Sequence, residues 1–170
     1  MKRLPGSVGV ITCMDSRVNL ESIGIPQFGT NGESESPVRI IRTIGAMPEA
    51  RSLVIGMFLA GIRELAVVMH TDCGCCLAFS KVDTIIDNLK TRLSAEKFKQ
   101  FRSEIGEPLR ENLIGWLKAF EDPRQAILSE IRALKKLSYV PDDFIIHGLL
   151  YELETGAIEI VVNGHHLDLT

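Results

Sequence analysis

The cysteine and histidine side chains of this sequence lie at spacings that suit a metal ion. Cys13 opens the segment CMDSR, and His70 and Cys73 follow further along the chain with two residues between them. Two thiolates and one imidazole, with a fourth position for water or a carboxylate, make a known catalytic zinc pattern. Sulfur donors favour zinc over magnesium or calcium, which prefer oxygen ligands. We therefore expect one Zn²⁺ per chain at Cys13, His70 and Cys73, with Asp15 placed to assist a bound water.

The distribution of the four cysteines argues against a disulfide framework. Cys73, Cys75 and Cys76 lie within four residues, and Cys13 stands alone. Clustered cysteines beside a histidine, in a chain without secretory features, indicate metal binding or thiol redox chemistry. The redox interpretation would use Cys73 and Cys76 as a C-x-x-C pair before a helix, where a thiol pKa is lowered. It leaves Cys13 and the histidine unexplained.

Length and charge narrow the classes of function. The chain has 170 residues, a net charge of −3 and a pI of about 5.8, which gives no electrostatic footprint for nucleic acid or an anionic membrane. The longest apolar stretch, Leu53 to Ile62, has ten residues, half the length of a spanning helix. The first residues lack the apolar run of a signal peptide. We expect one cytoplasmic domain over residues 1–170 that binds neither nucleic acid nor membranes.

Short β-branched runs alternate with a helical pattern in the first half of the chain. Strands are expected at 7–12, 38–42 and 64–69, because such runs fit strands buried on both faces of a parallel sheet. Residues 49–63 repeat apolar side chains at helical spacing between the second and third run. Strand, helix, strand is the pattern of a parallel crossover unit.

The second half of the chain begins with helical periodicity and ends with strand-like runs. Helices are expected at 82–93, 113–120 and 123–137. Strands are expected at 144–147, 149–153 and 157–162, and the turn at 154–156 joins the last two as a hairpin. The predicted fold class is α/β, with a mainly parallel β-sheet that has an antiparallel edge strand and is flanked by helices.

The reactive side chains fall at the carboxyl ends of the expected strands. The segment CMDSR follows the first strand, Arg42 ends the second, and His70 and Cys73 follow the third. Open α/β sheets bind their ligands at this edge. Three such groups at one edge favour a single site over three unrelated features.

Two motifs resemble those of the β-class carbonic anhydrases. CMDSR at 13–17 is similar to the family's C-x-D-S-R motif, and HTDCG at 70–74 is similar to its H-x-x-C-G motif. The segment GLLYELETG at 148–156 resembles the family's closing strand and turn. The resemblance covers most of the chain, whose short length is similar to that of the family's compact branch.

The resemblance implies a ligand set and a mechanism. Cys13, His70 and Cys73 would hold zinc, and Arg17 would bind and orient Asp15. Metal-bound hydroxide would attack CO₂ to give bicarbonate. In a closed state, which some family members adopt, Asp15 would instead be the fourth zinc ligand. The family also implies a homodimer or a multiple of dimers, with active sites near the subunit boundary.

Departures from the family pattern concern the substrate and the pairing of subunits. Where the family often has R-N-A-G-N, this chain has RTIGA at 42–46. Arg42 and Gly45 are retained and are expected to contact substrate, while both asparagines are replaced by less polar residues. A more apolar site favours carbonyl sulfide or carbon disulfide, and hydrolysis of these substrates is the main alternative to CO₂ hydration. Family members usually also have a helical segment before the first strand, and this segment commonly helps to hold the dimer together. In this chain the first strand is expected to start near residue 7, so the pairing of subunits is expected to differ.

Several of these residues also have structural interpretations. Asp15 and Arg17 could form only a structural ion pair, and Cys75 and Cys76 are interpreted as packing residues. His147 is expected to be a satisfied core histidine, whereas His165 and His166 are expected on the surface. A zinc-binding relative without catalytic activity is a further alternative.

Overall fold

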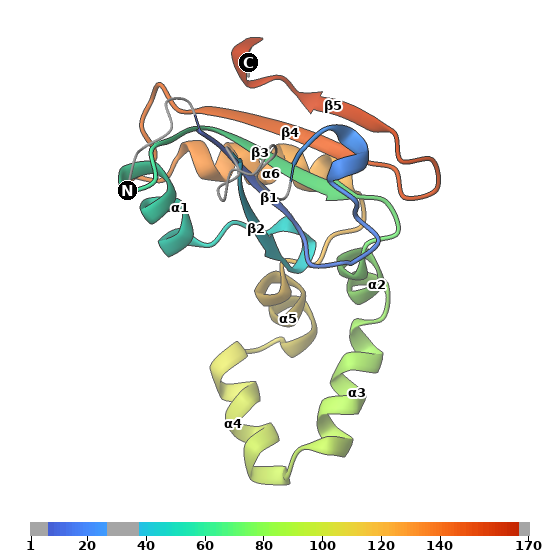
Figure 1. Ribbon diagram of the computed structural model, residues 1–170. Helices are drawn as coiled ribbons and strands as arrows, with labels where there is room; N and C mark the ends of the chain where they lie inside the picture. The colour runs from blue at the N-terminus through green and yellow to red at the C-terminus, as the bar shows by residue number, and fades with distance from the viewer. Residues whose placement is uncertain (1–6, 27–37, 167–170) are drawn as a thin grey trace. The chain divides into compact units, whose positions relative to one another are not determined.

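Five strands form one sheet in the computed structural model, which describes residues 7–26 and 38–166 (Figure 1). The strands are β1 (Ser7–Cys13), β2 (Val38–Thr43), β3 (Ile62–His70), β4 (Ile145–Tyr151) and β5 (Ile158–Val162). Their order in the sheet is β2-β1-β3-β4-β5, and only the β4–β5 pair is antiparallel. The predicted α/β class with an antiparallel edge strand is confirmed.

Contacts within the chain divide it into two units. The sheet unit comprises residues 1–71 and 123–170, and the helical unit comprises residues 72–122. The single domain expected over residues 1–170 stays a prediction. None of the helices in the described part of the chain is both long and apolar enough to span a membrane.

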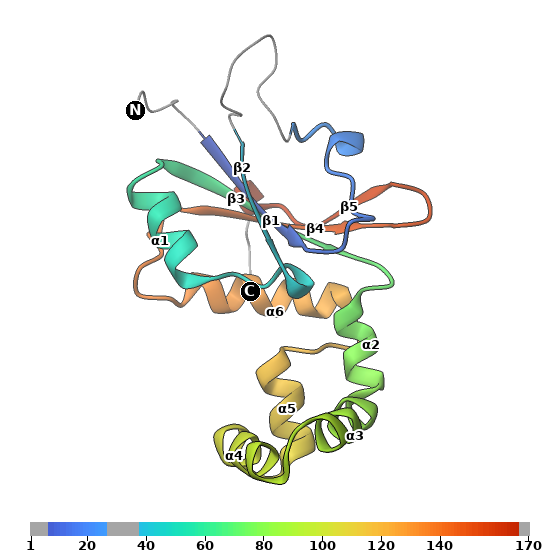
Figure 2. The same cartoon turned by 60° about the horizontal axis from the view of Figure 1, so that its bottom comes forward.

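Two helices cover one face of the sheet unit. Right-handed crossovers from β2 to β3 and from β3 to β4 run in the same direction across the sheet, so both connecting helices belong on the same face. Figure 2 shows α1 (Ala50–Phe58) and α6 (Pro123–Lys135) on that common side. Gly148 allows α6 to pack closely, because a Cβ there would lie 2.3 Å from a methyl carbon of Ile127.

The strands follow the predicted β-branched runs with two differences: β3 begins at Ile62, within the range 49–63 expected to be helical, and two expected strands form one. Residues Leu65 to Met69 of the central strand β3 are all buried, as expected for a strand covered on both faces. The two strands expected at 144–147 and 149–153 form the single strand β4, with Gly148 inside it. In the sequence alone, a glycine within an apolar run indicates the end of a strand, whereas in the structure Gly148 allows the helix to pack.

Four helices make up the helical unit. They are α2 (Gly74–Ser80), α3 (Val82–Arg92), α4 (Ala95–Ile105) and α5 (Leu109–Leu117). Val82, Ile86, Leu109 and Leu113 form their buried core. The helix expected at 113–120 starts earlier and ends earlier, because Lys118 adopts a left-handed conformation that terminates α5. The prediction missed α4, which begins at the Ser94 cap and packs Phe98 and Phe101 against the core.

Candidate metal centre

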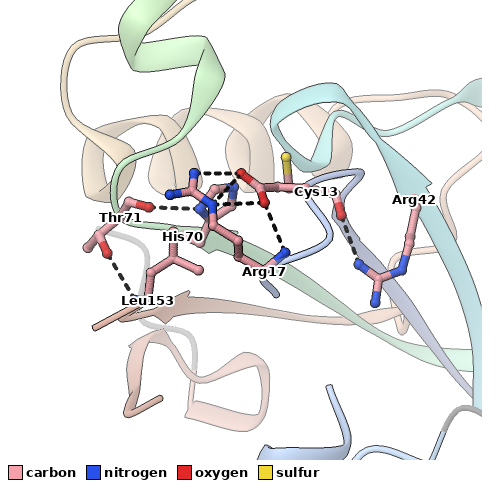
Figure 3. Close-up of polar contacts among 7 residues, drawn as sticks. Cys13, Arg17, Arg42, His70, Thr71 and Leu153 are labelled. Carbon is pink, nitrogen blue, oxygen red and sulfur yellow. Dashed lines mark hydrogen bonds and ion pairs between the residues drawn. The ribbon is translucent and has the colours of Figure 1, made fainter. Parts of the chain in front are cut away.

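The three predicted ligand residues come together at one edge of the sheet. Cys13 and His70 are the last residues of β1 and β3, which are adjacent parallel strands, and Cys73 follows three residues after His70. Their candidate ligand atoms all lie within 4.8 Å of one another. The exposed fraction is 2% for each cysteine and 0% for His70. The structure therefore gathers two sulfurs and one imidazole in a buried cluster, and Figure 3 shows two of its members, Cys13 and His70.

The segment between His70 and Cys73 contains one residue in a left-handed conformation. Asp72 has a positive φ of 52°, a left-handed conformation that aspartate tolerates better than most residues. Cys73 is then the cap residue of α2, and its carbonyl accepts the backbone N–H groups of Cys76 and Leu77. The last residue of β3 and the cap residue of α2 thus carry the two candidate ligands of one motif.

A chain of hydrogen bonds fixes the ring of His70. Its Nδ1 lies 2.7 Å from the carbonyl oxygen of Thr71, and because a carbonyl only accepts, Nδ1 carries the hydrogen. Nε2 therefore bears the lone pair that a metal needs. The Thr71 hydroxyl donates to Glu152 at 2.7 Å and accepts from the backbone N–H of Leu153 at 3.1 Å. Such outer partners orient metal-binding histidines.

Thr71 and Glu152 are functional candidates that the motif interpretation missed. Thr71 lies inside the HTDCG motif, and Glu152 follows the end of β4, the strand paired with β3. Their positions, inside a ligand motif and directly after a strand, are the one signal in the sequence that points to Thr71 and Glu152. The hydrogen bond between their side chains links two segments 81 residues apart, a separation that no local pattern reveals.

Asp15 is held by Arg17. Oδ1 of Asp15 accepts the backbone N–H of Arg17 at 2.9 Å, and Oδ2 accepts from the guanidinium at 2.7 Å (Figure 3). The guanidinium bonds first, and then the backbone bond, hold the pKa of Asp15 well below its usual range. Asp15 is thus an ionised acceptor at neutral pH.

Arg42 and Gly45 occupy supporting positions. The guanidinium of Arg42 donates to the carbonyl oxygens of Cys13 at 3.1 Å and Val18 at 3.2 Å, so it ties both ends of the loop that carries Asp15 and Arg17. Gly45 is buried in a short 3-10 helix, Ile44–Ala46, which packs against β1 and β3. The expected substrate contacts of Arg42 and Gly45 stay predictions.

Replacing Arg42 by methionine should reduce the free energy of unfolding by about 2 kcal/mol, because two hydrogen bonds from a charged donor are lost. Urea denaturation measures the change. Arg51, whose side chain is 92% exposed, provides the control, and Arg51→Met should change stability by less than about 0.5 kcal/mol. A raised KM with unchanged stability in Arg42→Met would instead assign Arg42 to substrate.

The environment of Cys76 does not favour redox activation. Cys75 is buried, and burial raises the pKa of the Cys76 thiol. Reactive thiols have lowered pKa values, because the thiolate is the nucleophile. The environment of Cys76 is therefore the opposite of what the C-x-x-C interpretation requires.

The donor set fits a zinc ion. Zinc accepts thiolate and imidazole ligands together and, with three protein ligands, keeps a fourth position for water. Magnesium and calcium would need oxygen ligands, and the group formed by Cys13, His70 and Cys73 offers none. An ion at this place would also balance the charge of two thiolates in a buried setting, where unpaired charges are costly.

Known proteins are similar to this chain in sequence and in fold. No protein-family model matches the chain. A carbon disulfide hydrolase from Acidianus sp. (strain A1-3) is 29% identical over 163 residues, which cover 86% of this chain and 72% of that protein. Beta-carbonic anhydrase 1 from Mycobacterium tuberculosis (strain ATCC 25618 / H37Rv) is 25% identical over 158 residues, 91% of this chain and 81% of that protein.

A solved structure extends the likeness to three dimensions. The carbonic anhydrase from Glaciozyma antarctica is 28% identical, with a TM-score of 0.69 over 94% of this chain and 85% of that chain. This chain is therefore similar in sequence and in fold to β-carbonic anhydrases and to carbon disulfide hydrolases.

Proposed function

We propose that this protein is a zinc enzyme that hydrates CO₂ to bicarbonate. The single observation that carries the proposal is the buried cluster of Cys13, His70 and Cys73, whose ligand atoms lie within 4.8 Å of one another. A catalytic zinc site has this composition. Relatives named as beta-carbonic anhydrases support the reaction.

Each side chain has a defined task in this proposal. Cys13, Cys73 and Nε2 of His70 hold the metal, and Thr71 keeps the ring of His70 in the tautomer that binds it. Zinc, when bound, lowers the pKa of a water molecule so that a nucleophile is available near neutral pH. Arg17 keeps Asp15 ionised and engaged, so the carboxylate would accept a hydrogen bond and would leave the fourth zinc position to water.

Hydrolysis of carbon disulfide or carbonyl sulfide is the second candidate. Met14 and Ile44, which adjoin Cys13 and Thr43, expose 63% and 50% of their surface, and the backbone of Met14 donates to Thr43 at 2.8 Å. Exposed apolar side chains beside the site favour apolar sulfur substrates. Relatives named carbon disulfide hydrolase support this candidate.

Initial rates with CO₂, carbonyl sulfide and carbon disulfide on zinc-loaded protein test the function directly. We expect CO₂ to give the highest kcat/KM, with Cys13→Ala as the inactive control. A higher kcat/KM with a sulfur substrate would favour the second candidate. If the preference arises from a small change in the pocket, the ratio of the two kcat/KM values should be about 10 to 100. A zinc-loaded protein inactive towards all three would contradict the proposal and indicate a binding protein without activity.

We further propose that the chain forms a homodimer or a multiple of dimers. Val54, Ile55, Phe58 and Leu59 on and after α1 are each between 38% and 64% exposed, and four neighbouring apolar side chains exceed what isolated surface residues explain. A second copy of the chain would cover them. No disulfide joins the four cysteines, all of which lie in the described part of the chain, and we propose a reducing, cytoplasmic location.

The double variant Phe58→Glu, Leu59→Glu should be monomeric, because burying two carboxylates against another apolar surface is unfavourable. Light scattering after size-exclusion chromatography gives the mass. Trp116 is 65% exposed in the helical unit, and Trp116→Glu is the control that should keep the wild-type mass. A wild-type monomer, or a double variant with unchanged oligomeric mass, would refute the assignment of this surface.

A further inference from the structure

A second group of metal-binding side chains lies in the sheet unit, at the amino end of β3. Glu64 on β3, His147 on β4 and His165 in the 3-10 helix Gly164–His166 each offer a ligand atom, and these atoms lie within 4.8 Å of one another. Oε2 of Glu64 is 3.8 Å from Nε2 of His147 and 3.8 Å from Nε2 of His165. Glu64 precedes His70 by six residues of extended strand, about 20 Å.

The fold places these three side chains on the same face of the sheet. His147 pairs with Ala66 across β3 and β4, and Glu64 is two residues before Ala66, so its side chain points to the same face. Gly148, the next residue, faces α6. His147 and Glu64 therefore lie on the face opposite to α6, where the segment after β5 brings His165 over them.

Gly164 makes this approach possible. A Cβ at Gly164 would lie 2.6 Å from the backbone oxygen of Ile146, so any other residue would push the 3-10 helix away from β4. Its backbone N–H donates to Nδ1 of His147 at 3.1 Å. This bond holds the ring so that Nε2 points to Glu64, and the two histidine rings meet edge to face at 5.1 Å.

We propose that Glu64, His147 and His165 bind a divalent first-row transition metal ion, with Zn²⁺ as the reference ion, at a site separate from Cys13, His70 and Cys73. Two imidazoles and one carboxylate are a common ligand set for zinc and its neighbours, and they suit these ions better than calcium or magnesium. Ligand atoms around a tetrahedral zinc ion are about 3.4 Å apart, so the 3.8 Å separations need only a small contraction.

The tautomer of His147 must change before its Nε2 can bind a metal ion. Burial, and then the neighbouring His165, lower the pKa of His147, so its ring is neutral near pH 7. Because Nδ1 accepts from Gly164, the ring hydrogen is on Nε2. A metal at Nε2 requires that hydrogen to move through solvent to Nδ1, with no net change in protons, and the N–H of Gly164 then bonds to water instead. Metal binding is therefore coupled to the backbone at Gly164.

Calorimetric titration of Zn²⁺ into protein that already holds one zinc per chain tests the site. We expect one further equivalent to bind the wild type and the affinity to fall at least 10-fold in His165→Ala and in Glu64→Gln. His166 is the neighbouring histidine outside the cluster, and His166→Ala should bind as the wild type does. In ¹H–¹⁵N spectra, the amide resonance of Gly164 should shift when the second equivalent binds.

Three results of the titration would contradict a metal site at Glu64, His147 and His165. No second equivalent, equal binding by His165→Ala, or loss of binding in His166→Ala would each overturn the proposal. The CO₂ hydration rate should be unchanged in His165→Ala and Glu64→Gln, because these residues lie outside the first cluster. A second equivalent that disappears only when Cys75 and Cys76 are replaced would assign it to the thiols and also overturn the proposal.

Discussion

Replacing Cys13 by alanine should remove zinc from the purified protein and reduce CO₂ hydration by roughly 10³-fold or more, because the metal's effect on a bound water is lost. Cys13 supplies one of two sulfurs in a group of three candidate ligands, and the remaining thiolate and imidazole cannot complete a stable zinc site. Zinc content by mass spectrometry and initial rates measure both effects on the same sample.

Cys75 provides a matched control for this experiment. Cys13 and Cys75 are both 2% exposed, so their replacement by alanine removes a buried sulfur from similar surroundings. Cys75→Ala should keep zinc and activity. Circular dichroism verifies that both variants are folded. If Cys13→Ala retains a full equivalent of zinc, or if Cys75→Ala loses it, the assignment of the ligands is wrong.

Replacing Asp15 by asparagine should leave zinc bound but lower kcat by about 10²- to 10³-fold between pH 7 and 9, because the charged acceptor of the hydrogen bond that positions the proton to be transferred is lost. The change keeps the size of the side chain and removes its charge. Asp72 is the control, because it has a left-handed conformation that asparagine also tolerates, and Asp72→Asn should keep the wild-type rate. Unchanged rates in Asp15→Asn would remove Asp15 from the mechanism.

The bond from Arg17 also has a consequence for the dependence of stability on pH. Because the pKa of Asp15 is lowered in the folded protein, the ion pair contributes stability that is fully present above the unfolded value of about 3.9. This contribution is lost as the pH falls through the lower folded value. The difference in the free energy of unfolding between wild type and Arg17→Met should therefore shrink below about pH 4. A difference that is constant from pH 3 to 7 would contradict the proposed interaction.

Local patterns were sufficient to predict the sheet and the grouping of the first site. The β-branched runs correspond to β1, β2 and β3, and the turn before residue 157 corresponds to the antiparallel β4–β5 pair. Parallel strands bring their carboxyl ends to one edge, which explains why Cys13 and His70 meet although they are far apart in sequence.

Other features depend on contacts that no local pattern encodes. The glycine inside β4 is explained only by Ile127 of α6, which a Cβ would meet. The many charged residues of α4 obscured a helix whose Phe98 and Phe101 pack on the core. His165 was expected only on the surface, and it is 50% exposed, yet the approach of Gly164 to β4 brings it to Glu64. That approach depends on one backbone contact between distant segments.

X-ray absorption at the zinc edge of the purified protein tests the central claim most directly. The ligand set of Cys13, Cys73 and His70 predicts two sulfur atoms at about 2.3 Å and one nitrogen at about 2.0 to 2.1 Å, with one oxygen or nitrogen atom completing the shell. The measurement should be made at one zinc per chain, so that the first site dominates. Three or four sulfur atoms would assign the metal to Cys75 or Cys76, and a shell without sulfur would contradict the account.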